Sequence, residues 1–414
     1  MKPQRTVLIT AYAVNPFKGS EDGTGWNISR ELAKENKVHV ITRKNNRDEI
    51  ERYMKEVNDP IHKNMQFHYY DLPKWIMFWK YKLGERGYVL YFYLWQLFLP
   101  VFVKRNKIKF DISHAVNFHS DSHPQFLWAL GKPVFWGPIG HHPPVPKSYL
   151  NPVYGRKNWL KDRMYNSVKF IMRRFDPFFY ISKWTAKRIF VINSGVNRAI
   201  GANPNKIVLL PAVAHNAVPE IDPENEKELF TVLAVGRFHY MKGFDITIRA
   251  FAHFYHHLRP SDRKKVKLKL VGKGEELDLI LKIIKEGNIQ EAVEVVKWVP
   301  KSEMEDIYKA SSVFCFGSHE GAGMVVPEAL SYGLPVVCFD NYGPGELCDD
   351  SCAIKIPYSS YYKSVRDFAE ALHKLYTDSG AYANYANAAR NFASSRFNWS
   401  TKAETISEAY ALVG

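Results

Sequence analysis

The second half of the chain alternates short apolar runs with segments that have the pattern of helices, and this alternation restricts the fold more than any other feature. Phe244, Ile248 and Phe251 recur at helical spacing in the first such segment. The apolar runs of strand length are 231–236, 267–272, 293–299, 313–317, 335–339 and 352–356. Strands that are separated by helices form parallel sheets covered on both faces. We therefore expect residues 218–396 to form an α/β domain, with the acidic, proline-bearing segment 219–226 as its linker.

A glycine-rich turn and a short helix follow the fourth of these runs, between Ser318 and Pro335. Pro327 is tolerated near a helix start, and Gly333 suits the left-handed cap that ends a helix. Glycines in the turn let backbone amides approach a ligand closely, and a helix N-terminus favours phosphate. The residues expected to line this anion site are Gly321, Ala322, Gly323, Met324 and Val325.

Two carboxylates flank the turn, because Glu320 lies on it and Glu328 lies about one helical turn into the helix. A carboxylate repels phosphate, so these side chains are expected to accept hydrogen bonds from hydroxyl groups instead. An anion site beside such acceptors indicates a sugar-nucleotide site.

This arrangement resembles the Glu-x7-Glu signature of retaining glycosyltransferases of family four, which include the group 1 enzymes of polysaccharide and lipopolysaccharide type. The resemblance implies the GT-B fold, in which two Rossmann-like α/β domains with parallel sheets face an interdomain cleft. It also implies that Glu320 binds the hydroxyls of the donor sugar in the catalytic centre and that Glu328 binds the ribose.

The first strand of this half ends at Gly236 and is followed by Arg237 and Lys242. Strand C-terminal ends point into the ligand crevice of open α/β sheets. Arg holds two phosphate oxygens in a fork, and Lys acts as a mobile point charge. Arg237 and Lys242 match the family's diphosphate-binding pair, which implies a catalytic role in stabilising the departing nucleoside diphosphate. By the same resemblance, a base pocket is lined by Gly272, Lys273 and Val299.

The first half also begins as strand, loop, helix and strand, so residues 1–217 are expected to form a Rossmann-like domain. The resemblance implies that this domain binds the acceptor. Its apolar runs are 7–11, 38–42, 110–115, 132–140, 189–193 and 207–210. A glycine-rich loop, 19–25, precedes a helical pattern at 26–35. This loop is either a plain connection or, as the resemblance implies, a loop near the donor phosphate, which makes Gly23 a donor-binding candidate. The final helix, 397–414, is expected to pack back on this domain.

Histidines follow the strand at 110–115, at the end where ligands bind in open α/β sheets. A lone histidine is usually structural, but relatives often place a histidine or aspartate from this region near the acceptor. His119 is therefore a catalytic candidate, and His114 is its rival. His141 and His142 depart from the family pattern, in which glycines follow the next strand.

Two segments combine aromatic and basic residues. The formal net charge is +15, and residues 156–188 carry ten Lys or Arg against two Asp, a local balance of +8. Residues 74–107 are aromatic and apolar with interspersed lysines. Their apolar part is shorter than the roughly 20 residues of a membrane-spanning helix, so it is either a core helix or an element at the membrane surface.

The basic segment fits anionic lipid, and a solvated basic helix or a site for single-stranded nucleic acid are the alternatives. No nucleic-acid-binding signature appears in the sequence. We therefore expect peripheral association with an anionic membrane through 74–107 and 156–188, and no nucleic acid partner.

The four cysteines have no second Cys or His pair at metal-ligand spacing, so reduced thiols are expected. The first residues do not have the pattern of a signal peptide, and we expect a cytoplasmic protein at the inner face of the membrane. The sequence has no Asp-x-Asp pair. We expect no metal site and no cofactor besides the nucleotide-sugar donor, because cationic side chains take the place of a metal in the resemblance.

These features, together with the resemblance, predict a glycosyltransferase that moves a hexose from a nucleotide-diphosphate sugar to a saccharide or lipid-linked acceptor. The resemblance implies that the configuration is retained. By resemblance, the leaving phosphate assists the acceptor. A sugar-nucleotide epimerase or hydrolase on the same fold is one alternative. A membrane- or RNA-binding protein with a degenerate site is another, and the intact pairs Arg237 with Lys242 and Glu320 with Glu328 argue against it.

Overall fold

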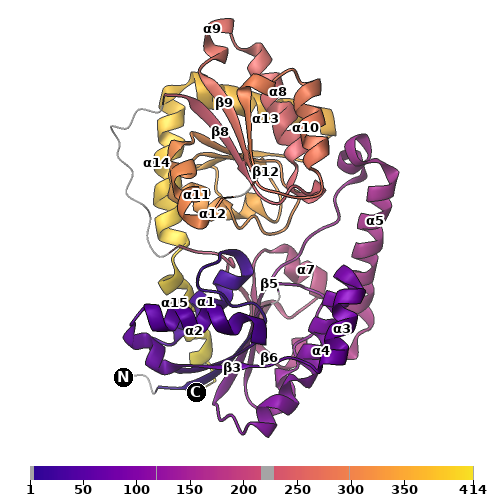
Figure 1. Cartoon of the computed structure of the whole chain (residues 1–414), viewed down its shortest axis with the longest axis vertical. Helices are drawn as coiled ribbons and strands as arrows, with labels where there is room; N and C mark the ends of the chain where they lie inside the picture. Colours follow the sequence, from indigo (N-terminus) through magenta and orange to yellow (C-terminus); the bar gives the residue numbers. More distant parts are fainter. Residues whose placement is uncertain (1–3, 118, 216–227, 298, 414) are drawn as a thin grey trace. The chain divides into compact units, whose positions relative to one another are not determined.

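The computed structural model describes residues 4–117, 119–215, 228–297 and 299–413. The chain forms two compact units (Figure 1). Unit 1 comprises Met1–His141, Ser167–Val213 and Trp399–Gly414, and unit 2 comprises His142–Asn166 and Ala214–Asn398. The predicted linker at 219–226 and the predicted boundary after residue 217 lie outside the described residues.

Unit 1 is built on a seven-stranded parallel sheet in the order β3-β2-β1-β4-β5-β6-β7. Its strands are β1 (Thr6–Ala11), β2 (Lys37–Thr42), β3 (Met65–Tyr69), β4 (Ile112–Asn117), β5 (Val134–Ile139), β6 (Ala186–Val191) and β7 (Ile207–Leu209). The strand order reverses between β1 and β4, which is where open α/β sheets bind ligands. The sequence analysis missed β3, because this edge strand has only one buried residue, Met65, and so shows no apolar run.

The helices of unit 1 are α1 (Ser20–Leu32), α2 (Arg47–Glu56), α3 (Lys74–Lys82), α4 (Gly84–Arg105), α6 (Pro177–Thr185), α7 (Gly195–Ile200) and α15 (Trp399–Ala411). The short 3-10 turns of this unit are η1 (Lys44–Asn46), η2 (Pro60–Asn64), η3 (Leu127–Leu130) and η4 (Pro204–Lys206). Helix α15 packs against α1, and Tyr410 of α15 is buried with its hydroxyl 2.7 Å from Nδ1 of His114. The expected loop at 19–25 is wrong, because α1 already begins at Ser20 and includes both later glycines of that stretch.

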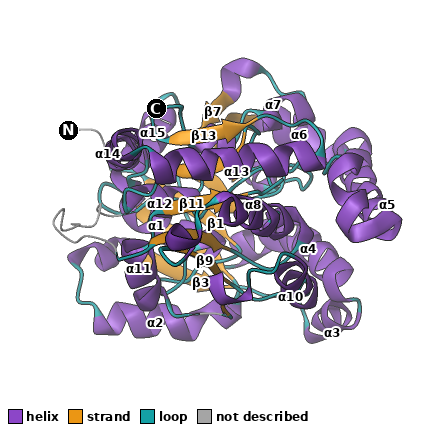
Figure 2. Cartoon of the chain, turned by 90° about the horizontal axis from the view of Figure 1, so that it is seen from above, coloured by secondary structure: helices purple, strands orange, loops and turns teal. Residues whose placement is uncertain are grey.

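Unit 2 has a six-stranded parallel sheet in the order β10-β9-β8-β11-β12-β13. Its strands are β8 (Phe230–Val235), β9 (Val266–Val271), β10 (Val293–Val296), β11 (Val313–Phe316), β12 (Val336–Phe339) and β13 (Ala353–Ile356). Each corresponds to one of the six predicted apolar runs, and helices lie on both sides of the strands (Figure 2). The order reverses between β8 and β11, so the ligand-binding end of this sheet lies where these two strands end.

The helices of unit 2 are α8 (Phe244–His257), α9 (Pro260–Arg263), α10 (Leu277–Glu286), α11 (Lys301–Ala310), α12 (Val326–Ser331), α13 (Tyr361–Thr377) and α14 (Ser379–Arg396). Its 3-10 turns are η5 (Tyr240–Lys242), η6 (Gln290–Ala292) and η7 (Pro344–Leu347). Helix α5 (Lys147–Phe175) begins in unit 2, has non-helical backbone at Gly155 and ends in unit 1.

The segment 142–166 is part of unit 2 although the sequence analysis assigned it to the first domain. Val145, Tyr149 and Leu150 are buried in the core of unit 2. The Tyr149 hydroxyl lies 2.8 Å from Oγ of Ser364 and accepts the Ser359 N–H at 2.8 Å. The proline-containing start of this segment gives no strand or helix pattern, so sequence periodicity could not assign it to either unit.

Candidate sugar-nucleotide site

The turns that follow β8 and β11 are joined by hydrogen bonds. The His319 N–H donates to the Met241 carbonyl at 2.8 Å, and the Ser318 hydroxyl donates to the same carbonyl at 3.1 Å. Gly243 has a φ of 62°, and a Cβ there would lie 1.7 Å from the Gly317 carbonyl oxygen. Only glycine permits this approach. The fold therefore brings together two turns that are about 80 residues apart in the chain.

Lys242 and Glu320 form an ion pair across these two turns. The Lys242 Nζ lies 2.7 Å from Oε1 and 2.6 Å from Oε2 of Glu320, and the side chains are 22% and 10% exposed. The Ser318 hydroxyl accepts the Glu320 N–H at 3.2 Å. Two of the residues predicted to share the site are thus in direct contact, and the cation retains some access to solvent.

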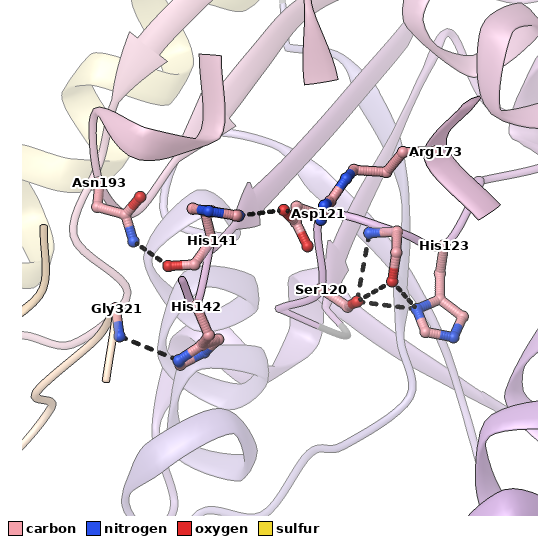
Figure 3. Close-up of polar contacts among 9 residues, drawn as sticks. Ser120, Asp121, His123, His141, His142, Arg173, Asn193 and Gly321 are labelled. Carbon is pink, nitrogen blue, oxygen red and sulfur yellow. Dashed lines mark hydrogen bonds and ion pairs between the residues drawn. The ribbon is translucent and has the colours of Figure 1, made fainter. Parts of the chain in front are cut away.

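The glycine turn offers backbone N–H groups beside this pair. The N–H groups of Ala322, Gly323 and Val325 donate to no acceptor among the described residues. Gly323 has a φ of 73°, which favours glycine. The Gly321 N–H instead donates to Nδ1 of His142 at 3.0 Å (Figure 3). Since α12 has only six residues, its dipole adds little, and the anion-binding capacity rests on the amides and the lysine.

Glu328 has a different partner from Glu320. The Tyr308 hydroxyl donates to Oε2 of Glu328 at 3.0 Å, and the Tyr308 ring stacks on Tyr332 with centroids 5.1 Å apart. Burial, together with the charge of Glu328, raises the pKa of Tyr308 well above its ordinary value. The tyrosine is therefore a permanent hydrogen-bond donor that fixes one carboxylate oxygen of Glu328.

Arg237 pairs with Glu275, a residue that the sequence analysis did not single out. The Arg237 Nη2 lies 3.1 Å from Oε2 of Glu275, and the side chains are 63% and 47% exposed. Backbone and Arg237 hydrogen bonds hold the pKa of Glu275 below its usual value even though burial opposes this. Arg237 does not contact the pair of Lys242 and Glu320 in the described structure. An exposed pair of this kind exchanges partners easily, so Arg237 is available to an incoming anion.

The predicted base-pocket residues lie on neighbouring turns of the same sheet. A Cβ on Gly272 would lie 1.9 Å from the Gly236 carbonyl oxygen, so the ends of β8 and β9 approach closely. The Phe238 N–H donates to the Lys273 carbonyl at 3.0 Å, and the Lys273 side chain is exposed. Val299 packs against a core cluster of unit 2, and its neighbour at 298 lies outside the described residues.

At the switch point of unit 1, the turn after β4 bonds to α1. The His119 N–H donates to Oε1 of Glu21 at 3.0 Å, and His119 Nδ1 lies 3.4 Å from the same oxygen. Both ring nitrogens are buried, and burial lowers the pKa of His119. The His119 ring is thus enclosed by protein.

The contacts of Gly23 and His114 are typical of residues that stabilise the fold. Gly23 lies inside α1, where its N–H donates to the Gly19 carbonyl at 3.1 Å and a Cβ would lie 2.7 Å from the Lys18 carbonyl oxygen. It is not the loop glycine that the sequence suggested. His114 is fully buried between the Tyr410 hydroxyl and the Gly137 carbonyl, each at 2.7 Å. Burial lowers its pKa to about 4, which is typical of a satisfied core histidine.

A buried polar cluster in unit 1 was not predicted. Asp121 is fully buried, and its Oδ2 lies 2.6 Å from Nδ1 of His141 and 2.7 Å from Nη1 of Arg173 (Figure 3). Although burial opposes ionisation, the hydrogen bond from His141 and the charge of Arg173 hold the pKa of Asp121 below its usual value. The His141 carbonyl also accepts a hydrogen bond from Asn193 at 3.0 Å. The His141–His142 dipeptide was the only sequence signal for this cluster, and it did not identify the partners.

The segments 74–107 and 156–188 expose large apolar side chains. Of the 24 exposed large hydrophobic residues among those described, 17 lie between residues 74 and 185. In unit 1 the side-by-side helices α3 and α4 carry several of them, including Trp75 (68% exposed) and Phe78 (59%). Lys80, in contrast, is buried with its Nζ 4.5 Å from the Tyr91 ring centroid.

Helix α4 is longer than the sequence analysis expected. The part Gly87–Arg105 is long and apolar enough to cross a membrane by length and composition, and 44% of its hydrophobic window is buried. Tyr91, Trp95 and Leu99 of this helix pack into the core of unit 1. A core helix passes the same test, so the helix alone is weak evidence for a membrane span. Among the described residues, no group of three or more His, Cys, Asp or Glu is placed to hold a metal ion.

Comparison with known proteins shows which family model the second half of the chain matches. Residues 219–392 match the family model of glycosyl transferases group 1. The chain resembles the amylovoran biosynthesis glycosyltransferase AmsD of Erwinia amylovora (27% identity over 221 residues, 53% of this chain and 55% of the relative). It also resembles a D-inositol 3-phosphate glycosyltransferase of Kribbella flavida (29% over 231 residues, 54% of this chain and 50% of the relative). The chain thus spans about half the length of these curated relatives.

Solved structures show the fold of the whole chain. Anabaena HepE in complex with UDP and glucose has a TM-score of 0.61 at 15% identity, covering 99% of this chain and 100% of that one. WaaG, a glycosyltransferase involved in lipopolysaccharide biosynthesis, has a TM-score of 0.63 at 17% identity, with coverage of 99% and 100%. The two parallel sheets are those of the GT-B fold, as the sequence analysis predicted.

Proposed function

We propose that this chain is a retaining hexosyltransferase that moves a sugar from a nucleotide-diphosphate donor to a saccharide or lipid-linked acceptor. The observation that carries the proposal is the set of unbonded N–H groups at Ala322, Gly323 and Val325 beside the pair Lys242–Glu320. Amides and a cation suit a diphosphate, and the carboxylate beside them suits sugar hydroxyls.

Each residue of unit 2 then has a role. Lys242 and Arg237 stabilise the charge that develops on the departing nucleoside diphosphate, which is the largest contribution that a preorganised site makes. Glu320 orients the sugar, and Glu328, held by Tyr308, accepts from the ribose hydroxyls. Because lysine and arginine supply the positive charge, the proposed transfer needs no metal ion and should proceed in EDTA.

The relatives support a role in cell-surface polysaccharide or glycolipid synthesis. Amylovoran biosynthesis, lipopolysaccharide biosynthesis and alpha-monoglucosyldiacylglycerol synthesis are the processes named for similar proteins. The bound UDP and glucose in the Anabaena structure favour a nucleoside diphosphate donor. Unit 1 is the proposed acceptor-binding unit.

A panel of UDP-, GDP- and ADP-sugars tests the donor assignment by thermal shift. A ligand that binds the native state raises the melting temperature by mass action, and we expect one sugar nucleotide to stand out. Arg237→Ala should abolish the shift, whereas Lys282→Ala, on the exposed side of α10, should leave it unchanged. A flat panel would contradict the proposal, and NMR of the product's anomeric proton would test retention.

We also propose that unit 1 associates peripherally with the cytoplasmic face of an anionic membrane. The exposed Trp75 and Phe78 suit the headgroup region, and the exposed Lys74 and Lys82 lie on the same helix or at its end. Co-sedimentation with phosphatidylglycerol vesicles should fall at least severalfold on replacement of both aromatics by Ser. The matched change Tyr362→Ser, at an aromatic residue that is 72% exposed in unit 2, should not reduce it. Equal sedimentation of both variants would overturn this assignment.

A further inference from the structure

The residues that follow β1, β2 and β3 gather at the carboxyl edge of the unit 1 sheet. Tyr12 and Arg43 come directly after β1 and β2, and Asp71 lies two residues after β3. Helices α3 and α4 add Lys80 and Tyr91 to the same cluster. Open α/β sheets bind ligands outside the carboxyl ends of their strands. The cluster therefore lies where a ligand of unit 1 is expected, and all of its members belong to that unit.

Lys80 is a buried cation without an anionic partner. The residue is 5% exposed, and its Nζ makes no hydrogen bond or salt bridge to the described residues. Instead, Nζ lies 4.5 Å, 5.0 Å and 5.4 Å from the ring centroids of Tyr91, Tyr88 and Tyr81. Burial of an unpaired ammonium costs free energy, and contacts with aromatic rings offset only part of that cost. The Nζ atom is not fully enclosed, so a ligand atom can approach it.

Arg43 is the second cation of the cluster. Its Nε donates to the Tyr12 carbonyl at 2.9 Å, and its guanidinium carbon lies 4.0 Å from the Tyr12 ring centroid. The ring centroids of Tyr12 and Tyr91 are 6.5 Å apart, so the two cations flank one pair of tyrosines. Burial lowers the pKa of Lys80, and the charge of Arg43 lowers it further. The two positive charges are thus close enough to repel each other.

The carboxylates near these cations have other partners. The Oδ1 atom of Asp71 accepts from the Tyr91 hydroxyl at 2.6 Å, and its Oδ2 accepts the Lys44 N–H at 3.0 Å. Burial raises the pKa of Asp22 and the charge of Arg43 opposes this, but these two described side chains form no salt bridge. The direct contacts of both cations are therefore with rings and a carbonyl, and an anion from another molecule would complete the cluster.

A phosphate group is the anion that fits the two side chains best. Arg43 presents a planar fork of donors that matches two phosphate oxygens, and Lys80 presents a point charge with three donors. A phosphate has enough oxygens to accept from both cations at once, whereas a carboxylate that fills the fork has few lone pairs left. The headgroup of a phospholipid and a water-soluble phosphorylated saccharide both carry this group.

We propose that Arg43 and Lys80 form a phosphate-binding subsite of unit 1, and that the acceptor carries this phosphate group. The inference rests on the proposed function, because it specifies the class of acceptor that unit 1 binds. The subsite holds the phosphate and does not react with it. It recognises the group that a lipid headgroup and a soluble phosphorylated acceptor have in common.

Calorimetric titration with sn-glycerol 3-phosphate tests the subsite without any donor. The titration uses the Lys242→Ala chain, in which unit 2 lacks the cation that would bind a competing phosphate. Addition of Lys80→Met should weaken binding by about tenfold or more, because the buried partner of the anion is lost. Addition of Arg43→Gln should weaken binding as well, because the fork of donors is lost.

The control is Lys132→Met, which removes the same charge from an exposed lysine just before β5, at the opposite edge of the sheet. It should change the affinity by less than about twofold. An equal affinity of Lys80→Met and Lys132→Met for glycerol 3-phosphate would overturn the proposal. Absence of measurable binding to the Lys242→Ala chain would overturn it too.

Stability separates a binding role of Lys80 from a packing role. Without ligand, Lys80→Met should raise the melting temperature, because methionine places no unpaired charge among the tyrosines. A lower melting temperature together with unchanged phosphate affinity would assign Lys80 to packing and contradict the subsite. If Lys80→Met melts without cooperativity, Arg43→Gln provides the comparison, and an affinity equal to that of Lys132→Met would be decisive against it.

Vesicles of phosphatidic acid distinguish the two sources of the phosphate. For a lipid headgroup, Lys80→Met should co-sediment severalfold less than Lys132→Met. For a soluble acceptor, the two variants should sediment equally while Lys80→Met alone loses affinity for glycerol 3-phosphate. With Lys242 intact, the donor-induced thermal shift should be the same in Lys80→Met as in the wild type. A failure of the subsite is thereby separated from a failure of the donor assignment.

Discussion

The charged side chains at the two sheet switch points differ in how far they are exposed. In unit 2, the side chains of Arg237 and Lys242 are 63% and 22% exposed. In unit 1, Arg173 is 13% exposed and its partner Asp121 is fully buried. Cations with access to solvent can exchange their protein partners for a large anion, whereas a buried carboxylate with two partners holds a single ring in one orientation. The comparison indicates that unit 2 provides cations for an anionic ligand at its switch point, and that unit 1 holds a side chain in a fixed orientation at its own.

The largest expected effect is that of Lys242→Ala. Loss of the cation beside the unbonded amides should lower the rate of nucleoside diphosphate release by about 10²–10³-fold. The rate is measured with the donor identified by thermal shift, and Lys282→Ala is the matched control. A loss below threefold would show that unit 2 does not provide the charge.

The second expected effect is a loss of stability at acidic pH. It should differ between the units because they differ in their buried histidines. Burial lowers the pKa of His114 and His123 in unit 1 to about 4, whereas their unfolded-state value is near 6.5. The unfolded chain therefore binds more protons between these values, so stability is lost as the pH falls below 6.5. Each histidine should cost about 2 kcal/mol between pH 7 and pH 5, as measured by urea unfolding.

Among the described residues of unit 2, His319 is the one histidine whose pKa burial lowers by a similar amount, to about 3. Because unit 1 has two such histidines, unit 2 should lose less stability than unit 1. Substitution of the exposed His256 by Gln should leave the pH dependence unchanged. Equal stability of the whole chain at pH 7 and pH 5 would show that the unit 1 histidines are not held neutral.

A smaller effect is expected from Gly323→Ala. The φ of 73° is unfavourable for alanine, and its Cβ would lie 3.1 Å from Cγ of Pro344. The change should cost about 1–2 kcal/mol of stability and weaken donor binding, because the amides of the turn must shift. Gly380→Ala in helix α14 should instead be neutral or stabilising, since its backbone is helical. Thermal melts of both variants, with and without donor, measure the change in stability and the change in donor binding. Unchanged donor affinity in Gly323→Ala would exclude the turn from the site.

The smallest expected effect is that of Glu275→Gln. An exposed pair contributes at most about 1 kcal/mol, so the free energy of unfolding should change by less than that amount. Release of Arg237 from its partner should leave donor binding unchanged or slightly tighter. Weaker binding, measured by calorimetry, would mean that Glu275 positions Arg237 instead of competing with the donor.

The two units also differ in how much of them could be predicted. In unit 2 the strands and the turn at Gly321 followed from local patterns, because buried strands and glycine turns leave short sequence signals. The family resemblance brought Lys242 and Glu320 to one site, but it did not predict their ion pair. The partners Glu275 and Tyr308 did not, since nothing in a sequence shows which carboxylate an exposed arginine meets.

In unit 1 the cluster of Asp121, His141 and Arg173 is made by residues 20 and 52 positions apart. No periodicity relates them, and only the tertiary fold brings them together. The early start of α1 and the edge strand β3 were missed for a local reason: glycines inside a helix and a half-exposed strand weaken the usual patterns.

The path of the chain between the units has a practical consequence. The backbone passes from one unit to the other after residues 141, 166, 213 and 398, so neither unit is a single continuous piece. A fragment that starts at residue 218 would lack Val145, Tyr149 and Leu150. The apolar core residues against which these side chains pack would then be exposed to water. Such a fragment should aggregate, whereas a peptide of residues 142–166 added in trans should improve its solubility.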